Sequence, residues 1–508
     1  EIMIKLNGKN LDMKNYESIV LKGEDLALAD EAVKKVQASY RIIEKIVKEN
    51  RRVYGVTTGF GKLVDISIPL NKIEELQLNI IRSHSVGYGE RFSYEDVRGA
   101  ILLRINTIIR GNSGVSMETL NTLIEMLNKR VYPYVPQQGS VGASGDLAPL
   151  SHIALAAIGE GECIESGKRV PSMNVLKKKN IKPAKLKPKE GLALINGTQM
   201  MTSVAGRCLI ESEILLKTAD IAAAVSADAL LSTTTPFEKR ITDIRNHRGQ
   251  RESAENMRSL LKDSSIRESH RKCEKVQDAY SIRCIPQVHG AAREAYYFAK
   301  NIIETEFNSS TDNPLVFIED KEVVSGGNFH GEMIAIPVDT LKMGISEIAN
   351  ISDRRIYRLI DPLQTNLPPF LSKNAGLNSG FMMLQVTTAS LVSENKILSH
   401  PASVDSIPTS LGQEDHVSMG TIGARKLSEV VKNTAGVLAI ELFAGLTALS
   451  MRAPLVSSLP LNALKKHFFK KVKPIENDRP FYKDIERISE MVLSGEIVST
   501  VEKYVKLK

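Results

Sequence analysis

Apolar residues recur along most of this chain at the three- and four-residue spacing of amphipathic helices. Residues 94–109 follow this pattern after a capping box that runs from Ser93 to Asp96, and Gly111 ends the run. A second helix is predicted over residues 338–360, where Pro362 stops the pattern. The apolar positions behind these two predictions are Val97, Ala100, Ile101, Ile105, Ile108, Ile109, Val338, Leu341, Ile345, Ile348, Ala349, Ile356, Leu359 and Ile360.

Two longer stretches, Gln199–Thr235 and Thr409–Ala453, contain no proline, and apolar residues persist throughout both. Helices of such length are typical of an elongated bundle and not of a compact α/β domain. The predicted fold class is therefore all-α. Strand-like alternation is sparse, and the candidate strands are Ile2–Leu6 with its Asn7-Gly8 turn, Leu315–Ile318 and Val323-Val324.

The segment Thr434–Met451 is apolar enough to suggest a membrane span. It contains Glu441 and several small residues, which favour a fully buried helix in a soluble bundle over a helix in a bilayer. We therefore expect no membrane partner.

A change in composition at Lys177–Lys189 suggests where the chain divides. A glycine- and leucine-rich segment, Gly191–Thr198, follows directly. We place the boundary near residue 200, with an N-terminal lobe over 1–200 and a long-helix bundle domain over 201–508.

The 508 residues are 42% hydrophobic, which allows a large core and more than one lobe. The net charge of +8 is partly local, because lysines gather in two clusters. The clusters are Lys177, Lys178, Lys179, Lys182, Lys185, Lys187 and Lys189, and Lys465, Lys466, Lys470, Lys471 and Lys473. The first cluster has no interleaved aromatic residue and contains two prolines, so we expect a solvated loop and no nucleic-acid partner.

The four cysteines form no C-x-x-C pair, which is typical of a reduced, cytoplasmic protein. The nine histidines show no H-E-x-x-H spacing, so no metal site is expected. The segment Glu1–Lys5 has no basic region followed by an apolar stretch, so we expect no signal peptide.

The chemistry of the chain is indicated by the segment Gly139–Pro149 and its central tripeptide, Ala143-Ser144-Gly145. Gly145 lacks a Cβ, so its nitrogen can approach the Ala143 carbonyl in a bend that other residues resist. Cyclisation and loss of the Ser144 hydroxyl as water would give a five-membered ring with a methylidene group. Such a ring is an electrophile, which unmodified side chains do not supply. The alternative is a flexible turn, although a glycine at every third position and Pro149 favour a tightly bent segment.

Two further motifs offer a base and a carboxylate anchor. Tyr54 precedes a glycine-rich loop, and its phenol becomes a base if a helix N-terminus or a cation favours the phenolate. Gln277, Tyr280 and Arg283 are spaced by three, so in a helical turn they share one face. Arg283 is suited to hold a carboxylate through two parallel hydrogen bonds. The alternative for this motif is a polar bundle face with a structural salt bridge.

The segments Gly139–Pro149, Tyr54–Gly61 and Val276–Cys284 resemble the aromatic amino-acid ammonia-lyase family. The resemblance implies that Ala143, Ser144 and Gly145 form 4-methylideneimidazol-5-one (MIO) without an added cofactor. It also implies the all-α fold shared with fumarase and aspartase, in a homotetramer whose sites are built at subunit contacts.

The resemblance also implies roles for single residues. Tyr54 removes the substrate β-proton, Arg283 binds the substrate carboxylate, and Gln277 and Tyr280 belong to the active-site shell. Asn196 matches an asparagine near the ring and the substrate, although Asn also favours a helix N-cap. Phe329 matches an aromatic pocket residue, although alone it would be interpreted as core. The segment Thr311–Pro314 matches the family too, but its sequence indicates no chemical role.

His84 and Glu414 bear on the choice of amino acid. An imidazole needs polar partners at both nitrogens, whereas a phenyl ring would leave a histidine and a carboxylate unpaired. These residues look like those of the histidine-acting branch, which implies conversion of L-histidine to trans-urocanate and ammonia. Departures from that branch leave an altered preference possible, and they are Ala279, Gly331, Leu411-Gly412 and His289. The alternatives are a lyase or 2,3-aminomutase acting on tyrosine or another aromatic amino acid, and a non-catalytic scaffold.

Overall fold

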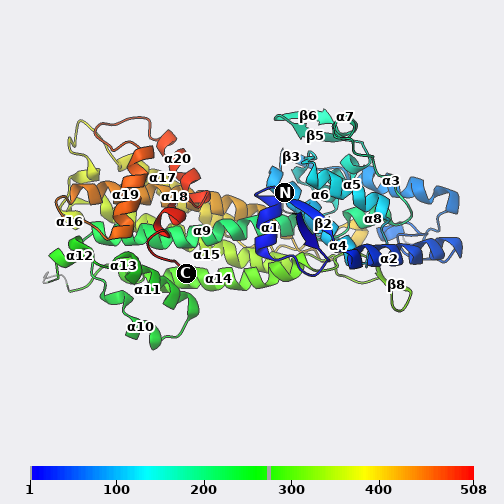
Figure 1. The fold of residues 1–508 in the computed structure, drawn as a ribbon, viewed down its shortest axis with the longest axis horizontal. Coiled ribbons are helices and arrows are strands. Elements are labelled where there is room, and N and C mark those ends of the chain that lie inside the picture. The colour runs from blue at the N-terminus through cyan, green and yellow to red at the C-terminus, as the bar shows by residue number, and fades with distance from the viewer. Residues whose placement is uncertain (1–2, 64, 272–275) are drawn as a thin grey trace. The chain divides into compact units, whose positions relative to one another are not determined.

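The computed structural model of the chain describes residues 3–63, 65–271 and 276–508, and helices predominate in it (Figure 1). The predicted all-α fold class is confirmed. The chain forms two compact units. Unit 1 comprises residues 1–207, 300–339 and 401–425, and unit 2 comprises residues 208–299, 340–400 and 426–508. The lobes expected from the sequence, 1–200 and 201–508, stay a prediction, whereas each unit draws on three separate segments.

Unit 1 combines short strands with helices of moderate length. Its elements are β1 (Met3–Leu6), α1 (Met13–Val20), β2 (Asp25–Leu28), α2 (Asp30–Lys48), η1 (Gly61–Leu63), η2 (Leu70–Lys72), α3 (Ile73–His84), β3 (Tyr88–Arg91), α4 (Tyr94–Ile109), α5 (Met117–Asn128), β4 (Pro136–Gln138), α6 (Leu147–Ala157), β5 (Glu162–Glu165), β6 (Lys168–Pro171), α7 (Ser172–Lys178), α8 (Glu190–Ile195), β7 (Leu315–Phe317), β8 (Glu322–Val324) and η5 (Ser410–Gly412).

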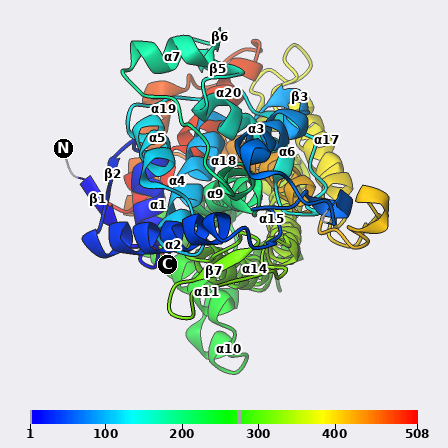
Figure 2. The same ribbon diagram turned by 90° about the vertical axis from the view of Figure 1, so that its right-hand side faces the viewer.

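Helix α4 is the centre of unit 1. Figure 2 shows it among α1, α2, α5 and α6, and it contacts all four. The predicted cap is confirmed, because the Ser93 hydroxyl accepts a hydrogen bond from the Asp96 backbone N–H at 3.0 Å. Every residue from Asp96 to Ile109 is buried, including Arg104. The unit therefore encloses polar side chains along α4 as well as apolar ones.

The strands form two-stranded sheets at the margins of the helices. β1 pairs in parallel with β2, so the strand predicted near the start of the chain is confirmed over Met3–Leu6, and Ile2 lies outside the described residues. β7 and β8 cover most of the two candidate strands near residues 315–324, and they pair with each other in antiparallel orientation.

Unit 2 is helical, and long helices supply much of it. Four of the five boundaries between the units fall within α9 (Gln199–Ala229), α14 (Ile285–Phe307), α15 (Glu332–Leu359) and α18 (Gly420–Met451), and the fifth follows residue 400. The other elements of unit 2 are η3 (Thr235–Phe237), α10 (Lys239–Asp243), α11 (Arg248–Leu260), α12 (Ser265–Ser269), α13 (Tyr280–Arg283), α16 (Pro362–Thr365), η4 (Pro369–Leu371), α17 (Met382–Leu398), α19 (Leu459–Lys471), α20 (Tyr482–Leu493) and α21 (Glu496–Val501).

Helix α18 contains the apolar segment that suggested a membrane span. Among the described helices it alone is long and apolar enough to cross a membrane, and 89% of its most apolar window is buried. Glu441 is fully buried there, with its Oε1 2.5 Å from Arg355 Nε. A buried charge with a buried partner indicates a core helix of a folded protein. The predicted buried helix is confirmed.

Candidate active site

The Ala143-Ser144-Gly145 tripeptide lies in the loop between β4 and α6, two residues before α6 begins. Gly145 has a φ of +71°, and a Cβ built on it would lie 2.1 Å from the carbonyl oxygen of Gly197. The same oxygen accepts a hydrogen bond from the Asp146 N–H at 2.7 Å. Because the two backbones approach so closely, this position requires glycine.

Hydrogen bonds hold the loop along its length. The Ser140 hydroxyl donates to the Gly145 carbonyl at 3.1 Å and accepts from the Gly142 N–H at 3.1 Å. Gly142 also has a φ of +71°, and the Ser418 hydroxyl donates to its carbonyl at 3.1 Å. The segment is therefore a fixed bend and not a free turn.

The Glu414 carboxylate lies directly against this loop. Its Oε1 accepts a hydrogen bond from the Ser144 hydroxyl at 3.2 Å. Its Oε2 accepts from the hydroxyls of Thr409 and Ser410, each at 2.7 Å. Two residues 270 positions apart, both expected to be functional, are therefore in direct contact.

Tyr54 and His84 both lie within the electrostatic influence of Glu414. Burial raises the pKa of the Tyr54 phenol, the Gly61 N–H lowers it by donating to the phenol oxygen at 3.3 Å, and Glu414 raises it. Burial lowers the pKa of His84, whereas the Ile80 carbonyl and Glu414 raise it. A cation or a helix N-terminus was expected to favour the Tyr54 phenolate. Among the described residues, neither contributes to the shift in the pKa of Tyr54.

His84 is held in one tautomer by the end of α3. Its Nδ1 is 2.8 Å from the Ile80 carbonyl oxygen, which can only accept. Nδ1 therefore carries the proton, and in the neutral ring Nε2 is left as a hydrogen-bond acceptor.

Asn196 is the C-cap residue of α8 and not the N-cap of α9, which begins at Gln199. It is 3% exposed. Its Nδ2 donates to the Asn313 carbonyl at 2.9 Å, and its Oδ1 has no hydrogen-bond partner among the described residues. A buried acceptor without a donor is costly, so this oxygen is a candidate contact for a ligand.

Phe329 is half-buried in the segment between β8 and α15. That segment is tied to unit 1 by the Gly326 N–H, which donates to the Asn313 side-chain oxygen at 2.8 Å. Asn313 therefore contacts both the Phe329 segment and Asn196.

Gln277, Tyr280 and Arg283 belong to unit 2, and the expected helical face does not form as predicted. Helix α13 includes Tyr280 and Arg283, but Gln277 precedes it in a segment without regular structure. The reason is local, because Ala279 is an extended N-cap and the Asp278 carboxylate accepts from the Thr233 N–H at 2.8 Å. Gln277 is exposed.

Tyr280 and Arg283 do lie together. The Arg283 guanidinium carbon is 4.5 Å from the centre of the Tyr280 ring, and Tyr280 is 70% exposed. The Arg283 Nε is buried and has no hydrogen-bond partner among the described residues. The guanidinium is thus stacked on an aromatic face and retains a donor for an anion.

The loop geometry fits the MIO ring. A ring built from Ala143, Ser144 and Gly145 needs a residue without a Cβ at its third position, and the close approach of Gly197 imposes that requirement. The hydroxyl that must leave belongs to Ser144, which is only half-buried and bonded to Glu414.

One group of metal-ligand types was not expected from the sequence. Ligand atoms of His330, Glu332 and His416 lie within 4.8 Å of one another. The two imidazole rings are stacked, with centres 5.7 Å apart and planes 3° from parallel. The His330 Nε2 is 3.2 Å from the His416 carbonyl oxygen. The His330 Nδ1 accepts from the Glu332 N–H at 3.3 Å, so both nitrogens of this ring have partners and the arrangement does not require a metal.

Asp146 is a second residue that sequence reasoning missed. It is fully buried beside Gly145 and accepts from the Thr421 hydroxyl at 2.6 Å and the Met201 N–H at 2.9 Å. Burial raises the pKa of Asp146 to about 6, although these hydrogen bonds lower it. The position of Asp146 directly after the tripeptide could have indicated a functional residue. Its burial could not be predicted, because it depends on segments that are distant in sequence.

The lysine-rich segment departs from the predicted solvated loop at both ends, and at its start Lys177 and Lys178 are the last residues of α7. Lys189 is fully buried, and its Nζ is 2.7 Å from Asp312 Oδ2. The prediction was wrong for this residue because its partner lies 123 positions away, where composition gives no signal.

Comparisons with known proteins extend over nearly the whole chain. Residues 11–473 match the family described as aromatic amino acid lyase. The histidine ammonia-lyase of Natranaerobius thermophilus is 48% identical over 502 residues, which cover 99% of each chain.

Solved structures are similar over the same extent. Histidine ammonia-lyase from Trypanosoma cruzi has a TM-score of 0.92 and 42% identity, covering 99% of this chain and 96% of its own. Tyrosine aminomutase from Streptomyces globisporus has a TM-score of 0.94 and 33% identity, covering 100% of both chains.

Proposed function

Because the chain belongs to the aromatic amino acid lyase family, we propose that it removes ammonia from L-histidine and releases trans-urocanate. The observation that carries the proposal is the contact between Ser144 and Glu414 at 3.2 Å. It brings a carboxylate to the tripeptide that the reaction requires. The 48% identity to a histidine ammonia-lyase supports the same substrate.

An imidazole fits the polar groups beside the loop. His84 offers Nε2 as an acceptor, and Glu414 offers carboxylate oxygens, so either can accept the one N–H of a neutral imidazole and the two together suit an imidazolium. An aromatic ring without nitrogen would leave the His84 acceptor desolvated and unpaired, and it would gain no hydrogen bond from the Glu414 carboxylate. We therefore assign His84 and Glu414 to the substrate side chain.

We propose that Ala143, Ser144 and Gly145 form the MIO ring without an external cofactor. The ring supplies an electrophile that engages the substrate and makes its amino group a better leaving group. Gly197 and Ser140 hold the loop that would carry it, through the contacts at Gly145.

Tyr54 is proposed as the base for the substrate β-proton. Because burial raises the pKa of its phenol, the phenolate needs positive charge nearby. The ammonium group of the bound substrate is a cation that can supply it. Tyr54 therefore becomes a base only when substrate is in place.

The remaining residues bind and orient the substrate. Arg283 takes the carboxylate, with Tyr280 and Gln277 in the surrounding shell, and Phe329 lines the pocket. Unit 2 carries the first three of these, and we propose a cytoplasmic homotetramer in which subunit contacts complete each site. The free thiols of Cys163 and Cys284 support a reducing compartment.

The experiment is turnover of a panel of amino acids with the purified chain, followed by ultraviolet absorbance and by chromatography of the products. Urocanate from L-histidine is the expected result. A β-amino acid from tyrosine would instead identify an aminomutase, which the likeness to tyrosine aminomutase makes the relevant rival.

Intact mass gives an independent result. A mass lower than that of the sequence by two waters supports the MIO ring. A full mass, together with no turnover of any amino acid, would identify a non-catalytic scaffold.

A further inference from the structure

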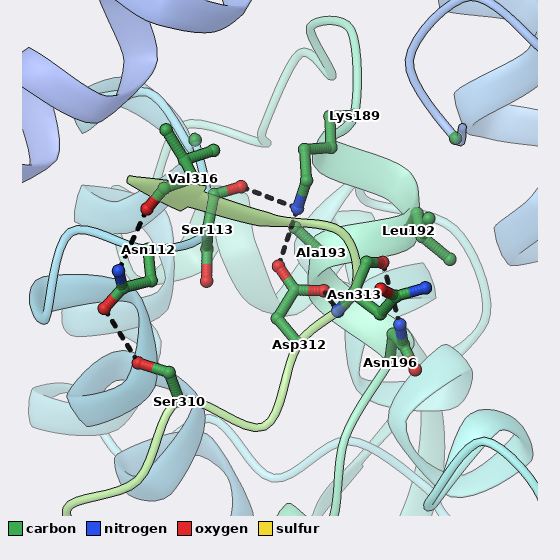
Figure 3. Close-up of polar contacts among 12 residues, drawn as sticks. Asn112, Ser113, Lys189, Leu192, Ala193, Asn196, Ser310, Asp312, Asn313 and Val316 are labelled. Atoms are coloured by element: carbon green, nitrogen blue, oxygen red, sulfur yellow. Dashed lines mark hydrogen bonds and ion pairs between the residues drawn. The ribbon is translucent and has the colours of Figure 1, made fainter. Parts of the chain in front are cut away.

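A buried ion pair lies next to Asn196 and has no role in the function proposed above (Figure 3). The Lys189 and Asp312 side chains are both 0% exposed, with Nζ and Oδ2 2.7 Å apart. Lys189 also donates to the Ser113 carbonyl at 2.8 Å. Burying two charges gains little stability, because desolvation offsets their attraction. Such a pair can instead fix the geometry of the groups around it.

A continuous chain of hydrogen bonds leads from the ion pair to Asn196. The Asp312 carboxylate binds Lys189 with Oδ2 and accepts from the Asn313 N–H with Oδ1, at 2.7 Å. The Asn313 carbonyl in turn accepts from Asn196 Nδ2 at 2.9 Å. Figure 3 shows these side chains in this order. The carboxylate thus fixes the peptide that binds the Asn196 amide.

Lys189 holds Asn196 by a second route. It is the N-cap residue of α8, in the left-handed conformation with a φ of +72°, and α8 ends at Asn196. A side chain other than glycine is strained there. The ion pair fixes the start of the short helix, and the Asn313 carbonyl fixes the side chain at its end.

The orientation of the Asn196 amide decides what it can bind. Asn313 presents an oxygen, so the NH₂ group must face it, because two oxygens in contact would repel. The Oδ1 atom then points away from Asn313, as Figure 3 shows, and it is buried without a donor among the described residues. The next residue, Gly197, pairs with Gly145 of the loop. The free acceptor therefore lies beside the reacting tripeptide and needs an N–H or O–H donor.

We propose that Lys189 and Asp312 are positioning residues that, through the Asn313 peptide, present Asn196 Oδ1 as an acceptor for the ammonium group of the amino-acid substrate. The inference rests on the proposed function, since it assumes an amino acid in this site. An ammonium ion has three donors and no acceptor, so it suits a lone carbonyl oxygen. Asn196 is thereby assigned to the substrate nitrogen and not to the ring oxygen or the carboxylate, both of which are acceptors.

The test measures binding in the Ser144→Ala background, in which turnover cannot consume the ligand. The ligands are L-histidine and 3-(imidazol-4-yl)propionate, which lacks the ammonium group. Asp312→Asn offers one acceptor where the carboxylate offers two, so it cannot serve both Lys189 and the Asn313 N–H. Histidine should bind about tenfold to a hundredfold more weakly, and the propionate within about twofold of the parent.

The matched control is Asp96→Asn. Asp96 forms a buried ion pair with Arg207 in the same unit, at 2.8 Å, and it does not contact Asn196. Loss of that pair should lower the unfolding temperature without changing the affinity for either ligand. Equal weakening of both ligands by Asp312→Asn would overturn the proposal.

A double-mutant cycle with Asn196→Ala tests whether the pair acts through Asn196. Asp312→Asn should have no further effect on histidine binding once Asn196 is truncated. A full additional loss in the Asn196→Ala background would show a general structural role and overturn the proposal.

Two double variants keep the test decisive if Asp312→Asn does not fold. Lys189→Met/Asp312→Ala removes both charges and the acceptor for Asn313, and it should weaken histidine selectively. Lys189→Met/Asp312→Asn frees the amide oxygen for the Asn313 N–H and should restore binding. Absence of urocanate from the wild-type chain would refute the proposed function, whereas an active wild type with unselective variants would refute only this inference.

Discussion

Two fully buried carboxylates, Asp146 in unit 1 and Asp220 in unit 2, have opposite surroundings. Asp146 lies beside the Ala143-Ser144-Gly145 loop and accepts from the Thr421 hydroxyl and the Met201 N–H. Within the described residues no ion pair forms with it, and the hydrogen bonds and the Arg104 charge lower its pKa less than burial raises it. Burial therefore dominates and raises its pKa to about 6.

Asp220 lies within α9, where every contact favours its charge. Arg293 and His289 approach it at 2.7 Å each, Asn256 donates at 2.8 Å, and the Ser253 hydroxyl donates at 2.7 Å. Burial alone would raise the pKa of Asp220, but Arg293 and the hydrogen bond from His289 lower it below its ordinary value.

The difference separates a structural carboxylate from one that belongs to a site. Both oxygens of the Asp220 carboxylate are paired, so this carboxylate serves folding. Asp146 directly follows the reacting tripeptide, and its surroundings disfavour the ionised form of its carboxyl group. Unfavourable conformations and environments concentrate at functional sites and are stabilised by the rest of the fold. The comparison therefore predicts that changes near the loop affect chemistry, whereas changes near Asp220 affect stability.

The largest expected effect is that of Ser144→Ala. The hydroxyl that must leave is absent, so the mass deficit of two waters should disappear and turnover of histidine should fall by at least about a thousandfold. Because Ser144 is half-buried, the free energy of unfolding should change by less than about 1 kcal/mol.

The measurements are intact mass, urocanate formation and urea unfolding. Ser151→Ala, in α6, is the matched control, because it removes a hydroxyl near the loop without touching the tripeptide, and it should keep the mass deficit. Wild-type turnover by Ser144→Ala would remove the basis for treating the loop as the reactive region.

The next effect is that of Asp220→Ala on stability. It leaves the Arg293 charge buried without its partner, so the free energy of unfolding should fall by about 3–5 kcal/mol. Turnover per folded molecule should stay within about twofold of wild type. Urea unfolding and active-site titration measure the two quantities. A large loss of turnover in folded protein would break the comparison.

The same contrast shows what the sequence could predict. Local signals sufficed for the α4 cap at Ser93, because capping and helical periodicity involve residues only a few positions apart. The tripeptide was also visible, because its three residues are consecutive. The spacing of Gln277, Tyr280 and Arg283 misled, since the helix includes only the last two.

Pairings between distant segments could not be predicted. Lys189 was assigned to a solvated loop because composition does not reveal Asp312, and Asp220 gave no signal of His289 or Arg293. The role of Thr311–Pro314 became visible only when the structure placed Asn313 against Asn196. Burial of a charge depends on the whole fold, so single-residue patterns do not indicate it.

The third prediction uses pH to distinguish the two carboxylates. In the unfolded chain an aspartate has a pKa of about 4. The folded pKa of Asp146 is about 6, so folding favours its protonated form. Its contribution to stability is therefore most favourable below pH 4 and declines by up to about 3 kcal/mol as pH rises through 6. The folded pKa of Asp220 is lowered, so its contribution is present above pH 4 and is lost as pH falls below that value.

The measurement is urea unfolding of wild type, Asp146→Asn and Asp220→Ala between pH 4 and 8. The stability lost in Asp146→Asn should shrink as pH rises, because wild type loses its advantage. The stability lost in Asp220→Ala should be largest at neutral pH and begin to shrink near pH 4. Parallel curves for the two variants would contradict the assignment of opposite environments.

The smallest effects come from removing one hydroxyl donor from each carboxylate. Thr421→Val removes the hydrogen bond to Asp146 Oδ1, and Ser253→Ala removes the one to Asp220 Oδ1. Asp220 keeps Arg293, His289 and Asn256, so Ser253→Ala should reduce stability by about 1 kcal/mol. Asp146 keeps the Met201 N–H and the influence of the Arg104 charge but has no ion pair, so Thr421→Val should reduce stability by about 2 kcal/mol at pH 8 and raise the pKa of Asp146 further. Because protonation relieves that loss, the effect of Thr421→Val should diminish at pH 5, whereas that of Ser253→Ala should not. If Thr421→Val lost the same stability at pH 5 and pH 8, the charge of Asp146 would be as well stabilised by its surroundings as that of Asp220.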